Sequence, residues 1–279
     1  MKWTPGGRSG NLEDRRGMGG MGAGLGLGGT VVVLALSLLF GRNLFSDLGV
    51  EPAVTSGGAP MTAADSAREE PEVQFVSFVL DDVQSTWQNI LTKYNEQFTP
   101  AKLVLFRNST QSGCGAAQSA MGPFYCPLDQ KVYIDLGFYE ELKKRFGASG
   151  DFAQAYVLAH ELGHHVQHLL GVDQQVRQQQ QSNPGAANQL SVRLELQADC
   201  FAGVWAATTN QRNMLDASDA QEAMNAAAAV GDDRIQAQTR GNVNVDSFTH
   251  GSSAQRTQWF KRGFDSGDPK ACDTFQTGG

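Results

Sequence analysis

The chain has 279 residues, of which 18% are charged, and a formal net charge of −7. This acidic balance argues against a nucleic-acid-binding protein, whose interaction face would be basic. The length allows one good-sized core or two small domains, and the sequence contains no internal repeat of solenoid length.

The N-terminal part predicts a membrane anchor. Residues 1–20 are polar and carry basic residues, whereas residues 21–41 begin with about 20 uncharged residues, near the length that spans a bilayer. The basic flank predicts a cytoplasmic segment 1–20, a single-pass anchor at 21–41 and a periplasmic or extracellular remainder. A cleaved signal peptide is the alternative, although no A-x-A site precedes GRNLF. The small, Pro-containing residues of 42–72 predict a flexible linker before a domain at 73–279.

We expect this domain to be of the α+β class, mostly helical with a small sheet. Apolar residues at helical spacing predict helices at 78–94, 136–146, 151–170, 188–209, 217–230 and 252–264. Strand-like runs predict strands at 101–106, 124–127 and 131–135. The polar stretches 173–185 and 231–246 are expected to be loops, and Asp151 is expected to cap the helix at 151–170.

The cysteines predict two disulfides if the domain lies outside the cytoplasm. The chain has Cys114, Cys126, Cys200 and Cys272, with no C-x-x-C pair. Three pairings are possible. We expect Cys114–Cys126, which closes a short loop, and Cys200–Cys272, which ties the C-terminal tail to a helix; four buried thiols are the alternative for a cytosolic domain.

The stretch His160-Glu161-Leu162-Gly163-His164 predicts a metal site. Residues four apart lie on the same face of a helix, so His160 and His164 can offer two imidazole nitrogens to one ion. Glu161 lies close enough to reach a water on that ion. Two neutral nitrogen ligands, a further ligand and a carboxylate base are what a zinc hydrolase requires.

The further ligand has to come from elsewhere in the chain. The metzincin extension is excluded, because Gln167 and Leu170 stand where it needs Gly and His. Glu195 and Asp199 are four apart on the predicted helix 188–209, and like charges at that spacing repel in water unless a cation lies between them. We expect Glu195 to be the third ligand and Asp199 to accept a ring N–H of a ligand His. Exchanged roles, and a helix with two solvated acids, are the alternatives.

The other histidines are less defined by the sequence. His250 is a candidate donor to the oxyanion of a hydrolysed carbonyl, together with Tyr125 and Tyr133; a loop histidine that packs the last helix is the alternative. His168 is one turn beyond His164 and is expected at the rim, and the place of His165 is open. The strands within 124–135 are a candidate edge for an extended peptide.

Several segments resemble the neutral zinc metallopeptidase family of bacteria, over about residues 73–275. These segments are HELGHHVQ at 160–167, SVRLELQADCFAGVW at 191–205, GPFYCP at 122–127, VYIDLGFY at 132–139 and FTHGSSAQR at 248–256. The family is similar to the gluzincins, which pair H-E-x-x-H with a downstream E-x-x-x-D. The resemblance implies a zincin-like fold, a Zn²⁺ cofactor, Glu195 as third ligand and Asp199 as its orienting partner.

Together these features predict a membrane-anchored zinc metallopeptidase that hydrolyses a peptide or protein substrate, with Glu161 as general base. A catalytically silent zinc-binding scaffold or chaperone-like protein is one alternative. A zinc hydrolase of a non-peptide amide, such as a cell-wall link, is another. Glu161 favours an enzyme, because a structural zinc site needs no such base. The oligomeric state is left open by the sequence.

Overall fold

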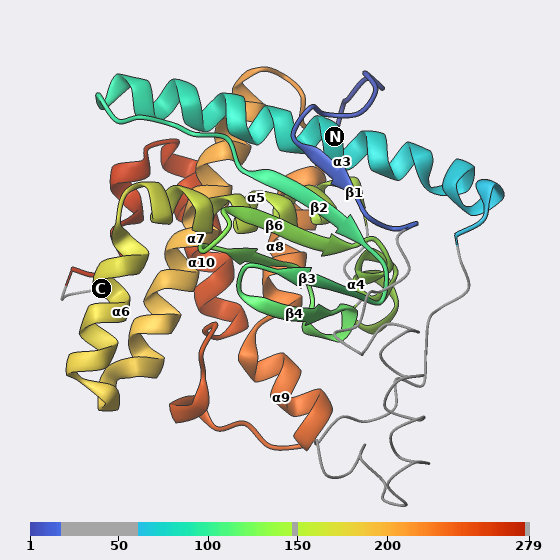
Figure 1. Cartoon of the computed structure of the whole chain (residues 1–279). Coiled ribbons are helices and arrows are strands. Elements are labelled where there is room, and N and C mark those ends of the chain that lie inside the picture. The colour runs from blue at the N-terminus through green and yellow to red at the C-terminus, as the bar shows by residue number, and fades with distance from the viewer. Residues whose placement is uncertain (18–60, 147–149, 277–279) are drawn as a thin grey trace, which may run out of the picture.

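The computed structural model describes residues 1–17, 61–146 and 150–276, in which helices pack behind a small sheet (Figure 1). The helices are α3 (Ala63–Lys93), α4 (Gly137–Phe146), α5 (Asp151–Leu169), α6 (Val172–Ser182), α7 (Ala187–Gln211), α8 (Asp219–Ala229), α9 (Asp232–Arg240) and α10 (Ser253–Ser266). The strands are β1 (Leu12–Asp14), β2 (Lys102–Phe106), β3 (Ser109–Ser112), β4 (Gly115–Gln118), β5 (Phe124–Cys126) and β6 (Lys131–Asp135). Short 3-10 turns are η1 (Ser119–Met121), η2 (Pro184–Ala186), η3 (Val245–Ser247) and η4 (Pro269–Cys272). The predicted α+β class is confirmed.

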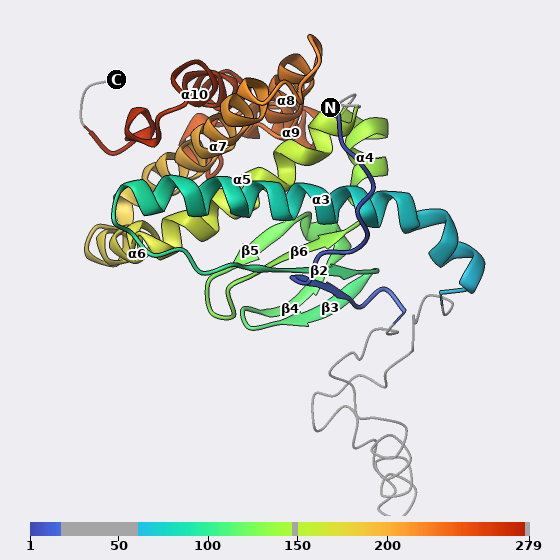
Figure 2. The same ribbon diagram turned by 90° about the horizontal axis from the view of Figure 1, so that it is seen from above.

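The main sheet has the order β1-β2-β6-β5. β1, β2 and β6 run parallel, whereas β5 is antiparallel to β6 and forms an edge of the sheet. Figure 2 shows α5, α7, α8 and α10 on one side of this sheet, with α3 running across the view between these helices and the strands. The β3–β4 hairpin forms a separate two-stranded sheet, which the sequence did not predict.

Residues 1–17 belong to the same folded body, although the sequence predicted a separate segment. Leu12 pairs with Leu103 of β2 in parallel register. Arg16 is buried and its guanidinium forms ion pairs with Asp14 at 2.7 Å and with Glu69 of α3 at 2.7 Å. A buried cation needs such partners, so this segment is an integral part of the fold.

The first long helix begins earlier than expected. α3 starts at Ala63, where Thr62 and Asp65 form a reciprocal capping box, and continues through Pro71. The linker prediction is therefore wrong for residues 63–72, whose polar, Pro-containing composition hid a helix held by the N-terminal segment. The predicted anchor at 21–41 lies outside the described residues. No helix within the described ranges is long and apolar enough to cross a bilayer.

Three other local expectations differ from the structure. The stretches 173–185 and 231–246 contain α6 and α9 rather than loops only; both helices are short and rich in polar residues, which hid them in the sequence. The N-cap of α5 is Gly150 rather than Asp151, which is the first residue of the helix.

The expected disulfides, Cys114–Cys126 and Cys200–Cys272, are both present.

The core forms where the helices cross closely. A Cβ at Gly263 of α10 would lie 2.0 Å from the Cys200 carbonyl oxygen of α7, and one at Gly203 of α7 would lie 2.1 Å from the Phe260 carbonyl oxygen. Only glycine allows this approach, and the Cys200–Cys272 bond ties the following tail to the same place. α10 is thus fixed in register against α7.

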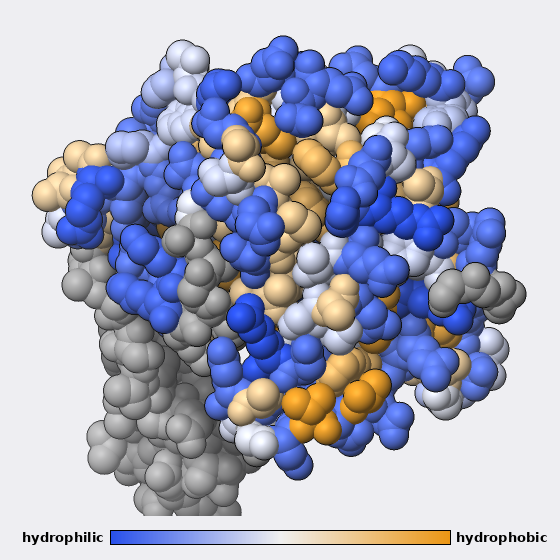
Figure 3. Space-filling view, turned by 180° about the vertical axis from the view of Figure 1, so that it is seen from behind, coloured by the Kyte–Doolittle hydropathy of each residue, from blue (hydrophilic) through white to orange (hydrophobic). Residues whose placement is uncertain are grey.

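On the face turned away from that of Figure 1, hydrophilic residues surround a central band of apolar ones (Figure 3).

Candidate metal centre

α5 and α7 bring His160, His164 and Glu195 together. The His160 Nε2 lies 3.1 Å from one Glu195 oxygen, and the His164 Nε2 lies 3.4 Å from the other. Ligand atoms about 2.0–2.1 Å from a tetrahedral zinc are themselves about 3.3 Å apart, so each imidazole lies at a suitable distance from the carboxylate. One ligand atom from each of the three side chains lies within 4.8 Å of the others. In the part of the chain that the structure describes, this is the one group of three such side chains close enough to share an ion.

The close packing of α5 on α7 depends on Gly163. A Cβ at this position would lie 3.1 Å from the Ala198 carbonyl oxygen and 3.2 Å from its Cα. The small residues at the crossing let the two backbones approach, so side chains one turn away, His160 and Glu195, can meet. The glycine inside the H-E-x-x-H stretch therefore has a packing role that the ligand pattern alone does not reveal.

Each ligand histidine is oriented by a second hydrogen bond. The Nδ1 of His160 lies 2.9 Å from Asp199 Oδ1, and the Nδ1 of His164 lies 2.8 Å from the Gln167 side-chain oxygen. Each Nδ1 therefore donates its proton away from the centre, and each Nε2 is the ring nitrogen that faces the centre and can become a ligand. Gln167 is itself fixed, since its amide donates to the Leu194 carbonyl oxygen at 2.7 Å. The role of Gln167, three residues after His164, was missed by the sequence reading.

The electrostatics of the site favour a bound cation. Burial lowers the pKa of His160, but the neighbouring carboxylates of Asp199 and Glu195 outweigh it and raise that pKa to about 10. Burial raises the pKa of Glu195, but His164 and His160 bring it well below its usual value. When no metal is bound, the carboxylates of Glu195 and Asp199 thus keep the histidines protonated. A divalent ion can replace these protons.

Glu161 and His250 lie in the cavity that contains the three ligands. The cavity has a volume of about 1340 Å³, and its wall includes Phe124 and Tyr125 of the edge strand β5. Glu161 is only 8% exposed, and its side chain makes no hydrogen bond to another described residue. A carboxylate in this position is free to accept a proton from a water molecule beside the ligands.

His250 is held at the cavity by Asp232, the first residue of α9. One Asp232 oxygen accepts the backbone N–H groups of Thr249, His250 and Gly251 at 2.8, 2.7 and 3.1 Å. The other lies 3.4 Å from the His250 Nδ1. Hydrogen bonding to Asp232 raises the pKa of His250, burial opposes this, and Glu195 adds to it. Asp232 was missed because its region was expected to be a loop.

His165, His168 and Tyr133 have partners outside the group of three ligands. The fully buried His165 lies 3.0 Å from the Tyr125 hydroxyl and 2.6 Å from the Thr99 carbonyl oxygen, and His168 lies 3.0 Å from Asp173. Neither histidine belongs to the ligand group. The Tyr133 hydroxyl donates to Asp129 at 2.6 Å and does not line the cavity, so the expectation of Tyr133 as an oxyanion donor is wrong.

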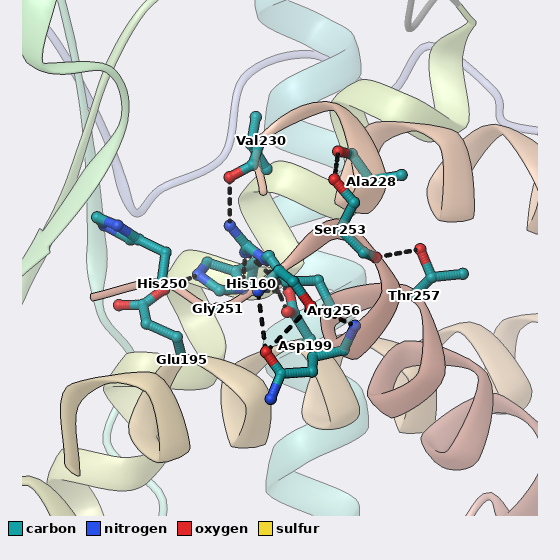
Figure 4. Close-up of polar contacts among 12 residues, drawn as sticks. His160, Glu195, Asp199, Ala228, Val230, His250, Gly251, Ser253, Arg256 and Thr257 are labelled. Atoms are coloured by element: carbon teal, nitrogen blue, oxygen red, sulfur yellow. Dashed lines mark hydrogen bonds and ion pairs between the residues drawn. The ribbon is translucent and has the colours of Figure 1, made fainter. Parts of the chain in front are cut away.

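A helix-borne H-E-x-x-H pair joined by a carboxylate from a second helix is one ligand set of zinc hydrolases. Figure 4 shows His160 of this pair with Glu195 and Asp199. The chain belongs to the family described as "Putative neutral zinc metallopeptidase", which matches residues 1–275. It is 48% identical over 288 residues to the uncharacterized protein YpfJ of Escherichia coli K12, covering 99% of each chain. It is also 48% identical over 206 residues to the uncharacterized protein Rv2575 of Mycobacterium tuberculosis H37Rv, covering 70% of this chain and 68% of the relative. No solved structure matches.

Proposed function

We propose that this protein is a zinc-dependent metallopeptidase in which His160, His164 and Glu195 hold the metal. The observation that carries the proposal is the spacing of 3.1 and 3.4 Å between the ligand atoms, with Glu161 beside them in one cavity. When bound, zinc would lower the pKa of its water and polarise the carbonyl to be attacked.

Glu161 is expected to carry out both proton transfers of the reaction. Glu161 accepts the proton of the attacking water and later delivers it to the leaving amine. Two oxygens on one carboxylate suit both transfers. The substrate chain is expected to lie in extended form along β5, because this strand is at the edge of the sheet and its residues Phe124 and Tyr125 line the cavity.

The direct test of the function is hydrolysis of a peptide library by the purified full chain. Cleavage that is abolished by a chelator and restored by zinc supports the proposal. Bound zinc without cleavage of any peptide would contradict it and favour a silent scaffold, whereas cleavage of a non-peptide amide alone would favour the other class of hydrolase.

His250 is proposed to donate a hydrogen bond to the oxyanion. Its Nδ1 lies 3.0 Å from the Thr249 hydroxyl and 3.4 Å from an Asp232 oxygen, which leaves Nε2–H of the protonated ring for the substrate side. Replacing His250 with Asn is expected to lower kcat/KM by about 10²-fold, in the range of a lost oxyanion donor, with zinc affinity retained. Hydrogen bonding to Asp232 raises the pKa of His250 above its usual 6.5, so the wild-type rate should fall only above that pH as the ring loses its proton. An unchanged kcat/KM in the variant would remove His250 from the mechanism.

We also propose attachment to a membrane through residues 21–41, with the body in an oxidising compartment. The two disulfides support such a compartment. A single crossing between residues 17 and 61, as the sequence predicted, would separate Leu12 from its partner Leu103 on the other side of the bilayer. We therefore place residues 1–17 on the same side as the body rather than in the cytoplasm.

The location can be measured with a membrane-impermeant thiol reagent on spheroplasts. Gly10→Cys and Gln221→Cys each place a thiol at an exposed position of the body. Both variants are expected to react before lysis. Reaction at position 221 alone would support the single crossing, and reaction at neither position would place the body in the cytoplasm.

A further inference from the structure

Arg256 is buried directly behind the ligand histidine, where Figure 4 shows it between Asp199 and Val230. Its side chain is only 5% exposed. The Nε donates to Asp199 Oδ2 at 2.9 Å, and one terminal nitrogen donates to Oδ1 at 3.0 Å. The other terminal nitrogen donates to the Val230 carbonyl oxygen at 3.2 Å. The guanidinium thus grips both oxygens of one carboxylate and is itself tied to the end of α8.

We propose that Arg256 is a positioning residue of the metal centre: its two-point hold on Asp199 fixes the oxygen that accepts the His160 Nδ1–H, and so aims the His160 Nε2 at the metal. This inference rests on the zinc site proposed above. It concerns a residue with no place in the H-E-x-x-H or E-x-x-x-D pattern, supplied by the last helix of the chain.

The carboxylate needs this hold because of its surroundings. Asp199 has no exposed surface, and an ionised carboxylate buried alone would cost several kcal/mol. Its Oδ1 also accepts the Tyr156 hydroxyl and the His160 Nδ1–H, but donors on one oxygen alone leave the carboxylate free to rotate about that oxygen. The bidentate guanidinium fixes both its plane and its charge. Lysine would supply the charge but not the paired geometry.

The backbone holds Arg256 in the required register. Ser252 and Gln255 form a capping box that starts α10 at Ser253, so Arg256 lies in the first turn. The Ser253 hydroxyl donates to the Ala228 carbonyl oxygen at 2.7 Å, and Gly263 fixes the other end of the helix against α7. The segment from His250 to Arg256 therefore serves both sides of the centre, with His250 in the cavity and Arg256 behind the ligand.

The test measures zinc affinity by competition with a chromogenic chelator, in the full chain. Arg256→Gln is expected to weaken zinc binding by 10–100-fold, the range for loss of an orienting partner. Because Arg256 acts through Asp199, the double variant Arg256→Gln/Asp199→Asn should bind zinc no more weakly than Asp199→Asn alone. Arg262→Gln is the matched control: it removes a charge from an exposed position of the same helix and should leave zinc affinity unchanged.

Thermal unfolding of the zinc-free proteins separates positioning from plain stabilisation. If Arg256→Gln does not fold, Arg256→Lys keeps the charge, and it should bind zinc at least about 10-fold more weakly than the wild type. Unchanged zinc affinity in the folded variant, or losses that add in the double variant, would overturn the inference. A wild-type chain that binds zinc without hydrolysis would instead contradict the proposed function and leave this test intact.

Discussion

Replacing Glu161 with Gln is expected to abolish most hydrolysis while the protein keeps its zinc. Gln has nearly the same shape, but its amide cannot accept the proton of the attacking water. General base catalysis contributes about 10²–10⁴-fold, so kcat should fall by at least about 100-fold. The zinc content should be unchanged, because the structure places Glu161 beside the three ligands and outside the group that they form.

A carboxylate elsewhere on the cavity wall provides the control for this variant. Glu140 of α4 lines the same cavity, and its side chain is 66% exposed and paired with Lys144. Glu140→Gln should retain nearly full kcat. If Glu161→Gln keeps its activity, Glu161 is not the base. If Glu161→Gln loses zinc as well, the residue belongs to the metal site in another role.

Replacing Glu195 with Ala is expected to have the largest effect on metal binding. It removes one of three ligands and leaves His160 and His164 with no carboxylate between them, so zinc affinity should fall by more than about 100-fold, beyond the range for an orienting residue. Asp199→Ala removes no ligand; it removes the acceptor of the His160 Nδ1–H at 2.9 Å and the partner of Arg256, and it should weaken zinc binding by about 10–100-fold.

The order of these two losses is the discriminating result. Equilibrium dialysis against zinc at fixed pH gives both affinities under the same conditions. A greater loss in Asp199→Ala than in Glu195→Ala would exchange the roles of the two acids. Equal affinities in both variants and the wild type would remove both residues from the site.

The helices of the site could be predicted because their signals are local. H-E-x-x-H and the apolar spacing define α5, and the same periodicity defines α7 around Glu195. The polar first part of α3 and the strand β1 carry no such apolar periodicity. Each depends on the other through contacts such as Arg16 with Glu69, which are 53 residues apart.

The residues of the metal site also fall into those with a local sequence signal and those that depend on tertiary packing. The spacing of His160 and His164, and of Glu195 and Asp199, follows from the helical repeat. Arg256 and Asp232 could not be assigned, because their partners come from tertiary packing: Arg256 meets Asp199 across 57 residues. His250 alone was singled out in that region, as the one histidine outside the cluster, and the structure supplies the carboxylate that holds it.

The zinc content of the purified full chain tests the central claim most directly. Elemental mass spectrometry should find about one zinc per chain in the wild type, as three ligands from one protein imply. A double variant, His160→Ala and His164→Ala, should contain almost none. A wild-type protein that takes up no zinc, or a double variant that retains it, would contradict the assignment of His160, His164 and Glu195 as the metal centre.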